Sequence, residues 1–387
     1  MPVKNTAIIG AGVAGLTTAL ALARHGIRSH IFEQAAEMTE VGAGLQISPN
    51  ASHILDELGI LETLAGIWLE PREIRLVSGI SLRQIAAVPC GDFARRRWHA
   101  PYGVLHRATL QRTLLDAVVA NPLCSLHLGQ QVEAATAKST AARSGSEPEL
   151  IIGADGVWSS MRDAVPAAPM PRFSGNVAWR FTVSEAAAPD FLDRTSVTAF
   201  LGPSAHLVCY PLKETNGFNI VAITAGGAAA HEWAAIGSQA QRDLLMRCFS
   251  DWDRAVATAM SAVENPTFWP LYEVGDGRWH NGKDTVLIGD AAHAMMPFAA
   301  QGAAMAIEDA YELAGALARS PLPEAIEFFE RHRAPRVARL RQRAAFNRFA
   351  YHARGPFKLG RDLVLAFRPP QSLAADLDWI YGYRAAV

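Results

Sequence analysis

Residues 6–15 read T-A-I-I-G-A-G-V-A-G, and this stretch decides the fold. Its first four residues are an apolar, β-rich run, and the three glycines that follow have the G-x-G-x-x-G spacing. A helical pattern then continues to His25, and residues 27–32 are typical of a second strand. This order of strand, glycine-rich turn, helix and strand predicts a βαβ unit of the dinucleotide-binding kind.

The glycine spacing predicts a nucleotide site for physical reasons. Gly10 makes the tight turn, Gly12 lets backbone N–H groups approach a pyrophosphate, and Gly15 lets the helix pack on the strand. The start of the helix attracts phosphates. Glu33, which ends the second strand, can accept both hydroxyls of an adenosine ribose and would repel a 2′-phosphate. The site therefore suits FAD or NAD, and the alternative is a merely tight strand–helix turn.

The composition of the chain is that of a globular protein. It has 387 residues, half of them apolar, so it can form one elaborated domain or two that share a core. Its 36 basic and 37 acidic residues nearly cancel, which disfavours nucleic acid or anionic lipid as a partner. The four cysteines lie far apart, which disfavours a disulfide framework and indicates a reducing cytoplasm. Glycines interrupt the apolar N-terminal run, so we expect neither a signal peptide nor a membrane span.

Further along the chain, helical and β-type patterns alternate. Helices are expected from Ser48 to Gly59, over 109–120, from about Gln301, and over 323–349 with an interruption at Pro335. Strands and loops are expected over 73–98 and 171–270, a hairpin tip over 138–149, and packed irregular structure over 368–383. The pattern predicts a dinucleotide fold split by a β-rich insertion.

Two more motifs contain an aspartate beside a glycine. They are G-A-D-G at 153–156 and G-D-A-A-H at 289–293. Either aspartate alone would most often be a helix N-cap or part of an Asx turn. Together with the first glycine motif and H-R-A-T-L-Q at 106–111, however, their order resembles the single-component, FAD-dependent aromatic hydroxylases. G-A-G-L-Q-I-S-P-N at 42–50, A-Q-G-A-A-M-A-I-E-D-A at 300–310 and D-W-I-Y-G-Y at 378–383 are similar to the salicylate hydroxylase branch, with its 3-hydroxybenzoate 6-hydroxylase and 6-hydroxynicotinate 3-monooxygenase relatives.

The resemblance implies an α/β fold with a Rossmann-like FAD-binding domain, an interleaved β-sheet substrate domain and a helical C-terminal part. The expected FAD-binding segments are 1–72, 99–170 and 276–322, the substrate domain is 73–98 and 171–275, and the helical region is 323–387. The resemblance also assigns cofactor contacts to fifteen residues: Gly10, Ala11, Gly12, Val13, Ala14, Gly15, Glu33, Gln34, Arg107, Val132, Asp155, Asp290, Pro297, Gly302 and Ala303. Many relatives have Arg at position 34.

The implied activity is that of a flavoprotein monooxygenase. NADH or NADPH, bound transiently because there is no second G-x-G-x-x-G, reduces FAD. O2 then forms a flavin hydroperoxide, which hydroxylates a salicylate- or hydroxybenzoate-like phenolic acid, with or without loss of CO2. Alternatives are a flavin oxidase or reductase acting on another ring, such as a pyridine or quinone, and a non-catalytic nucleotide-binding sensor. A monomer or a homodimer is expected.

On the substrate side, the branch has a His and a Tyr at the spacing of His206 and Tyr210. Four residues apart on a strand, both face one side, about 13 Å from each other. Either could assist removal of a phenol proton, and the alternative is that both are ordinary strand residues. Gln46 and Gln301 are candidate substrate contacts, although Gln301 has a structural alternative at its helix start.

Arg180 and the histidines are further polar residues with a bearing on this site. Arg180 could clamp a carboxylate, but pairing with an acid across the sheet is favoured, and His293 is expected to be structural. The histidines are too scattered to compose a metal site.

Overall fold

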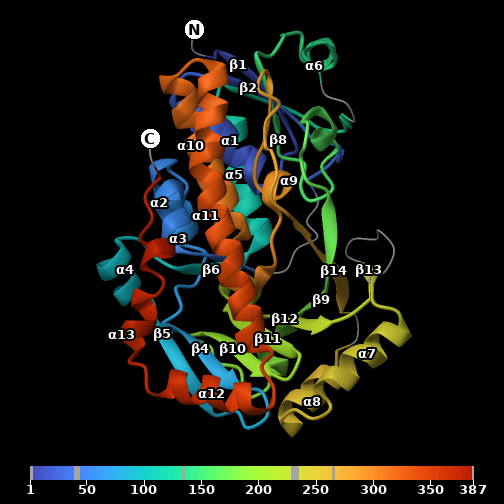
Figure 1. The fold of residues 1–387 in the computed structure, drawn as a ribbon, viewed down its shortest axis with the longest axis vertical. Coiled ribbons are helices and arrows are strands. Elements are labelled where there is room, and N and C mark those ends of the chain that lie inside the picture. The colour runs from blue at the N-terminus through green and yellow to red at the C-terminus, as the bar shows by residue number, and fades with distance from the viewer. Residues whose placement is uncertain (1–2, 39–43, 133–135, 228–234, 264–265, 386–387) are drawn as a thin grey trace.

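The computed structural model describes residues 3–38, 44–132, 136–227, 235–263 and 266–385. Within them a parallel sheet and a larger mixed sheet form the two ends of an elongated molecule (Figure 1). A separate two-stranded antiparallel ribbon is formed by β3 (Gly44–Ile47) and β6 (Gly103–His106). Its strands come from the same parts of the sequence as the strands of the parallel sheet. The first two residues of the predicted 42–50 motif lie outside the described residues.

The parallel sheet contains the βαβ unit that the glycine motif predicts. Its strands, in spatial order, are β15 (Thr285–Leu287), β8 (Leu150–Gly153), β1 (Asn5–Ile9), β2 (Arg28–Phe32) and β7 (Cys124–His127). All four pairings are parallel. Helices at this end include α1 (Val13–Arg24), α2 (Pro49–Glu57), α3 (Leu61–Ala65), α5 (Arg107–Ala120) and α10 (Gly302–Arg319). The predicted α/β class is confirmed, and the carboxyl ends of its strands meet at one edge, where such folds bind ligands.

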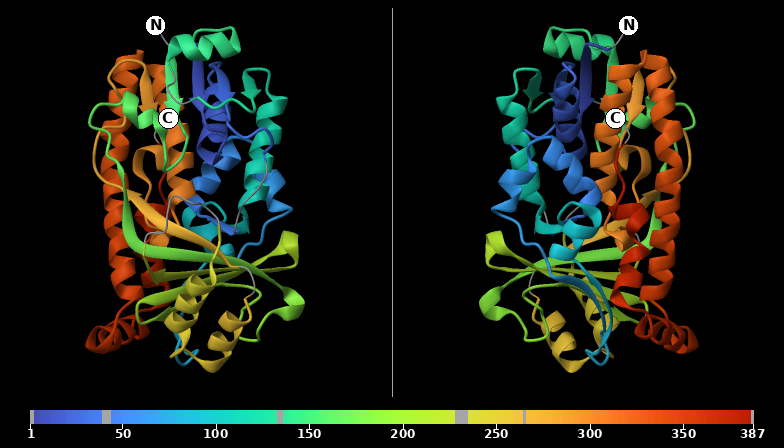
Figure 2. Two further views of the ribbon diagram at one scale, coloured as in Figure 1. Left: turned by 90° about the vertical axis from the view of Figure 1, so that its right-hand side faces the viewer. Right: turned by 90° about the vertical axis from the view of Figure 1, so that its left-hand side faces the viewer.

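The mixed sheet crosses the other end of the molecule (Figure 2). Its order is β13 (Ala235–Ile236), β14 (Thr267–Val274), β9 (Pro171–Ser184), β12 (Gly217–Ala225), β11 (Ala205–Leu212), β10 (Val197–Gly202), β4 (Glu73–Ser78) and β5 (Gln84–Pro89). One face looks toward the parallel-sheet end. On the other face, α7 (Gln239–Phe249) and α8 (Arg254–Ser261) pack on a second core with Trp179, Phe200 and Phe218.

One long helix joins the two ends. α11 (Leu322–Tyr351) runs beside α10 and continues to the mixed sheet, as Figures 1 and 2 show. The remaining helices are α4 (Asp92–Trp98), α6 (Ala137–Ser144), α9 (Asp290–His293), α12 (Gly355–Ala366), α13 (Pro370–Ala375) and α14 (Asp378–Tyr381), with 3₁₀ turns η1 (Ser160–Ala164), η2 (Glu185–Ala187), η3 (Lys213–Thr215) and η4 (Pro297–Ala299).

Four helices lie inside regions where the sequence patterns predicted strands, loops or a hairpin tip, so the predictions are wrong at those positions, although the expected strands are present elsewhere in the two β-type regions. The expected hairpin tip over 138–149 is largely α6, and α4, α7 and α8 interrupt the two β-type regions. Local capping explains two of them. The Thr136 side chain accepts from the Ser139 amide and the Ser139 side chain accepts from the Thr136 amide, and Ser238 and Gln241 do the same for α7. Such capping boxes start helices in short polar segments without a clear apolar period.

Two predictions for the C-terminal region are also wrong. α11 passes through Pro335 without the expected interruption. Proline removes one hydrogen bond of the helix ladder, but here the flanking Arg333 and Val337 are both fully buried, and this packing outweighs the local preference. The region 368–383, expected to be irregular, contains α13 and α14.

Candidate functional site

A cavity of about 710 Å³ lies at the carboxyl ends of β1, β2 and β8, where the glycine, D-G and G-D motifs meet. Twelve of the fifteen predicted cofactor residues line it: Gly10, Gly12, Val13, Ala14, Glu33, Gln34, Arg107, Val132, Asp155, Asp290, Gly302 and Ala303. Ala11, Gly15 and Pro297 do not. The fold therefore brings together residues that are up to 293 positions apart in the sequence.

The three glycines have the different surroundings that their predicted roles need. Gly10 has φ +103°, and a Cβ there would lie 2.5 Å from the carbonyl oxygen of Ala154 in the D-G motif. A Cβ on Gly15 would collide with the carbonyl oxygen of Gly10. Gly12 has nothing within 4 Å of that position and lines the cavity. Gly10 and Gly15 thus allow close backbone packing, and Gly12 leaves room for a ligand.

Glu33 is fixed at the rim of the glycine loop. Its Oε2 accepts from the amide of Ala11 at 2.9 Å, and its Oε1 accepts from the amide of Ala35 at 3.0 Å. Each carboxylate oxygen keeps a further lone pair. The side chain can therefore accept hydroxyl hydrogen bonds without leaving the loop, as the ribose role requires.

The Asp155 carboxylate has one oxygen that caps a turn and one oxygen that is free for a ligand. Its Oδ2 accepts from the amides of Ser160 at 2.8 Å and Met161 at 3.3 Å, which caps η1. Its Oδ1 is buried and has no hydrogen-bond partner. A buried acceptor without a partner is unfavourable, so this atom suits a ligand donor from the cavity.

Arg162, which the sequence did not single out, joins the two aspartate motifs. It is buried and donates to the carbonyl oxygens of Val157 at 2.5 Å and Asp290 at 2.9 Å. Burial lowers the pKa of its guanidinium, and the nearby carboxylates of Asp155 and Asp290 oppose that shift. The guanidinium therefore holds the D-G and G-D loops against each other.

The Asp290 carboxylate is held toward the cavity by a buried network behind it. Gly289 has φ +56°, and its amide donates to Asp309 Oδ2 at 2.9 Å. The same oxygen bonds His293 Nε2 at 2.5 Å, and Arg333 Nε donates to Asp309 Oδ1 at 2.8 Å. Burial alone would raise the pKa of Asp309, but His293 and Arg333 outweigh it and lower the pKa to about 2. His293 is thus structural in this geometry, as expected, while Asp290 is exposed in the cavity.

Gln301 belongs to the same network rather than to the cavity. It is 2% exposed; its amide donates to Ser48 Oγ at 2.8 Å and accepts from Asn50 Nδ2 at 3.2 Å. Asn50 in turn donates to Glu308, which pairs with Arg333. These contacts favour the structural alternative for Gln301, and they fix the start of α10, whose first two residues, Gly302 and Ala303, line the cavity. The first amides of a helix are free to donate to a ligand.

Gln46, the second predicted substrate contact, also lies behind the cavity wall. Its Oε1 accepts from Tyr102 Oη at 2.6 Å, whereas its neighbours on the ribbon, Gly44 and Leu45, line the cavity.

His206 and Tyr210 share one face of β11, as their spacing predicts, and that face looks toward the parallel-sheet end. Tyr210 packs in the core of that end, and His206 lies 5.0 Å from the ring of Phe298, next to Pro297 (between ring centroids). Both are almost fully buried, and neither lines the 710 Å³ cavity. Burial raises the pKa of Tyr210 and lowers that of His206 well below its usual value.

His352, at the end of α11, is a partner that the sequence gave no signal for. Its Nε2 lies 2.9 Å from His206 Nδ1. Burial, with the charges of Arg348 and Arg354, lowers the pKa of His352 to about 4. Both rings are therefore neutral at physiological pH, and one donates to the other.

Arg180 does not have the acidic partner that the sequence analysis favoured. Within the described residues it makes no ion pair, its Nε is buried without a hydrogen-bond partner, and its guanidinium lies 4.9 Å from the Trp269 ring centroid. Burial and the nearby charge of Arg107 lower its pKa to about 10, while Tyr210 opposes the shift. Arg180 stands on the sheet wall of the cavity, so an unpaired cation faces the space between the two ends of the molecule.

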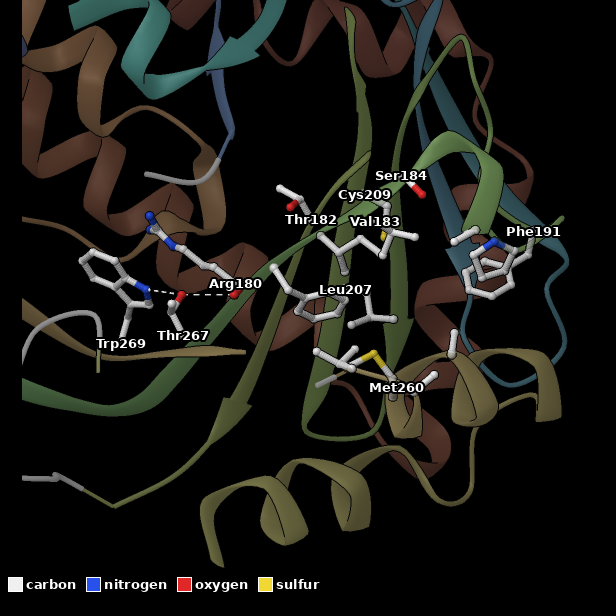
Figure 3. A pocket seen from close by; sticks show the side chains of 17 residues that line it. Arg180, Thr182, Val183, Ser184, Phe191, Leu207, Cys209, Met260, Thr267 and Trp269 are labelled. Atoms are coloured by element: carbon white, nitrogen blue, oxygen red, sulfur yellow. Dashed lines mark hydrogen bonds between the residues drawn. The ribbon is translucent and has the colours of Figure 1, made fainter. Parts of the chain in front are cut away.

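A second cavity, of about 600 Å³, lies on the opposite face of the mixed sheet, over α8. Figure 3 shows its apolar side chains, among them Leu207, Cys209 and Met260, with Arg180 at its edge and the guanidinium directed away from them. None of the fifteen predicted cofactor residues lines it. The predicted cofactor residues that line one of these two cavities therefore all line the first.

The first cavity fits FAD. The open space at Gly12, the orphaned Asp155 oxygen and the exposed Asp290 carboxylate each leave a ligand position free. Within the described ranges, no three His, Cys, Asp or Glu side chains are grouped so as to hold a metal ion. Over the same ranges no helix is both long and apolar enough to cross a bilayer.

Comparison with known proteins gives matches along nearly the whole chain. Residues 4–344 match the family model described as FAD binding domain. A 3-hydroxybenzoate 6-hydroxylase of Aquipseudomonas alcaligenes is 34% identical, with 98% of both chains covered. A 3-amino-4-hydroxybenzoate 2-monooxygenase of Streptomyces cremeus is also 34% identical, with 98% of this chain and 95% of the relative covered. The solved structure of a salicylate hydroxylase–substrate complex has the same fold, with a TM-score of 0.79, 23% identity and coverage of 99% and 96%.

Proposed function

We propose that this protein acts on a phenolic aromatic acid. The chain belongs to the FAD binding domain family and is a FAD-dependent aromatic monooxygenase. The names of the two relatives, which act on hydroxybenzoates, support a salicylate- or hydroxybenzoate-like ring. The reaction consumes O2 and NAD(P)H.

FAD, when bound, supplies the chemistry that passes two electrons from NAD(P)H to O2, so that one oxygen atom enters the ring and the other leaves as water. For the residues of this chain we propose four roles. The amides around Gly12 bind the pyrophosphate, Glu33 accepts from the adenosine ribose, and Asp290 accepts from a ribityl hydroxyl. The amides of Gly302 and Ala303 donate to the pyrimidine edge of the flavin, where the positive end of α10 favours negative charge.

The single observation that carries the substrate class is the unpaired guanidinium of Arg180. This guanidinium lines the cavity without an acidic partner, so a carboxylate of the substrate could pair with it there. The Trp269 ring under the guanidinium keeps it in place. Arg180 also lies near Tyr210, so an acid bound there would have its ring beside the face of β11 that carries Tyr210 and His206.

We propose that Tyr210 and His206 handle the phenol proton. An aromatic ring accepts an electrophilic oxygen more readily when its hydroxyl is deprotonated. The buried, neutral His206 can accept a proton at one nitrogen while the other bonds His352. Tyr210 is protonated at neutral pH, burial raises its pKa further, and its hydroxyl can donate to the phenolate oxygen.

We also propose the division of the chain into FAD-binding segments 1–72, 99–170 and 276–322, a substrate domain of 73–98 and 171–275, and a helical region from 323. The membership of the sheets supports it, because β4, β5 and β9–β14 build the mixed sheet. We propose that the protein acts in the cytoplasm, with a small aromatic molecule rather than nucleic acid or membrane as its partner. Its four cysteines are unpaired, which suits a reducing compartment.

The test is a screen of phenolic acids for stimulated NADH or NADPH oxidation, with mass analysis of the product formed under ¹⁸O2. We expect one labelled oxygen atom in the ring. Oxidation of NADH or NADPH that gives a product without the label would contradict hydroxylation.

Arg180→Met tests the substrate class. We expect KM for the acid to rise by about tenfold to a hundredfold, as the loss of a charge-assisted hydrogen bond implies. The same phenol without its carboxylate should be equally poor for both proteins. An unchanged KM for the acid would remove Arg180 from the substrate site.

A further inference from the structure

Helix α12 has its charged face toward the protein and its apolar face toward solvent. Arg361 is 7% exposed and donates to the carbonyl oxygen of Ala350 at 2.7 Å. Lys358 and Asp362 are about one-quarter exposed and pair at 3.0 Å. No residue of α12 is buried. A surface helix of a monomer normally has the reverse orientation, so the burial of α12 is incomplete in the isolated chain.

The outward face of α12 continues onto the end of α11. The rings of Phe349 and Phe357 are 5.7 Å apart, so the two helices share one surface. We call this surface the apolar corner; it consists of Phe346, Phe349, Phe357, Leu359, Leu363, Val364 and Phe367. Figures 1 and 2 show α12 projecting at the end of the molecule away from the parallel sheet.

The apolar corner is too large to be an ordinary exposed patch. Its seven members are 57–81% exposed and make up half of the fourteen large apolar side chains that are exposed in the described residues. With about 150–250 Å² for a fully exposed large side chain, they offer on the order of 900 Å². Monomers seldom expose more than about 300–600 Å² in one patch, and a standard interface takes about 800 Å² from each partner.

The chemistry of the corner suits a second copy of this chain better than a lipid surface. Both cations of α12 pair with Asp362 and face inward, so this helix lacks the row of free basic side chains by which interfacial helices hold anionic lipid. Gly360 lies on the outward face with open space around it, which allows close approach of another helix. An apolar face of this kind is complementary to itself across a two-fold axis.

We propose that the apolar corner is the interface of a homodimer in which α12 of one subunit packs against α12 of the other. The proposal is independent of the substrate and of the cofactor roles above, because none of the seven residues lines either cavity.

The experiment is sedimentation velocity of the FAD-loaded protein over a wide range of concentration. We expect the wild type to sediment as a dimer. Leu363→Glu with Phe367→Glu should raise the dimer dissociation constant at least tenfold while FAD content and melting temperature stay unchanged. Val119→Glu, at a 68% exposed position on α5, is the matched control and should stay dimeric.

A second variant guards against misfolding of the first. Gly360→Arg adds a long side chain to the outward face, where nothing of the same chain lies within 4 Å of its Cβ. It should also give monomers. A monomeric wild type, or variants that remain dimeric, would overturn the proposal. So would a wild type that is monomeric alone and binds vesicles of phosphatidylcholine with phosphatidylglycerol.

Discussion

The cavity lies between two regions whose polar groups differ. The nucleotide wall consists of the glycine, D-G and G-D motifs with Glu33, and the sheet wall is the part of the mixed sheet that faces them, with the side chains packed behind it. On the nucleotide wall, Glu33, Asp155 and Asp290 each keep acceptor capacity that the protein does not use. On the sheet side, His206 and Tyr210 are buried in packed side chains and do not line the cavity, and His206 already bonds His352. The first wall is prepared for a ligand with many hydroxyls and phosphates, and the second keeps neutral acid–base groups in an apolar setting. Binding and proton transfer should therefore be separable by mutation.

The strongest test of this separation is Gly12→Val. The backbone at Gly12 has φ −74°, which valine tolerates, and nothing lies within 4 Å of the new Cβ, so the fold should persist. The side chain would occupy the pyrophosphate position, and we expect purified protein without FAD. Absorbance of the flavin and the melting temperature of the apoprotein are the measurements. Gly66→Val, also at φ −74°, is the control. A variant that stays fully yellow would contradict the role of this loop.

On the sheet wall, His206→Ala and Tyr210→Phe should retain FAD and its reduction by NADH. Hydroxylation should fall by about 10²–10⁴-fold, the usual range for general acid–base assistance, and hydrogen peroxide should replace product. The ratio of product to NADH consumed measures this. Leu207→Ala, equally buried on the other face of β11, should lower stability and leave the ratio unchanged. Wild-type ratios in both variants would make His206 and Tyr210 ordinary strand residues.

Asp290→Ala, on the nucleotide wall, should weaken FAD binding less than Gly12→Val does. The loss of one charge-assisted hydrogen bond costs about 1.5–3 kcal/mol, so FAD affinity should fall by about tenfold to a hundredfold. The fold should persist, because Asp309 rather than the Asp290 side chain holds the Gly289 turn. Titration of the apoprotein with FAD and thermal melting distinguish the two effects. Unchanged affinity with a collapsed melting temperature would show that Asp290 is only a helix cap.

The smallest expected effect concerns the pH dependence of the sheet wall. The folded pKa of His352 is about 4, whereas the unfolded value is near 6.5, so the unfolded chain binds more protons between these values. Stability is therefore highest above pH 6.5 and falls by up to about 3 kcal/mol as pH drops toward 4. His352→Gln should reduce the loss of melting temperature between pH 7.5 and 5, and His99→Gln, at an exposed position, should not. Equal losses in wild type and His352→Gln would contradict the burial of a neutral pair.

The nucleotide wall could be predicted from sequence because its signals are local. Gly10, Gly12 and Gly15 lie in one turn, and each aspartate stands beside a glycine that makes its loop. The roles of the buried partners could not be predicted in the same way. Arg162 and Arg333 act through pairings that depend on which loops and helices meet, and an arginine in a helix has no local mark of burial.

The sheet wall was predictable only in part. The spacing of His206 and Tyr210 gives their common face, because side chains alternate along a strand. His352 lies 146 positions away, so its pairing with His206 depends on where the end of α11 meets the sheet. Arg180 was expected to have an acid opposite it, but its cross-strand neighbours are Val221 and Thr267. The register of β9 against β12 and β14 determines which residues lie opposite Arg180, and the sequence around Arg180 does not specify that register.

The position of β15 affects how this protein is made. β15 is contributed by residues 285–287, yet it pairs with β8, and the Gly289 turn follows it. A ribosome releases the whole mixed-sheet segment before this last strand of the parallel sheet. The cofactor site therefore cannot close on a nascent chain until about three-quarters of it has been synthesised, and chain segments with high sequence separation are joined late and slowly. We expect chains that stop before Thr285 to be unable to retain FAD, because they lack β15 and the Gly289 turn.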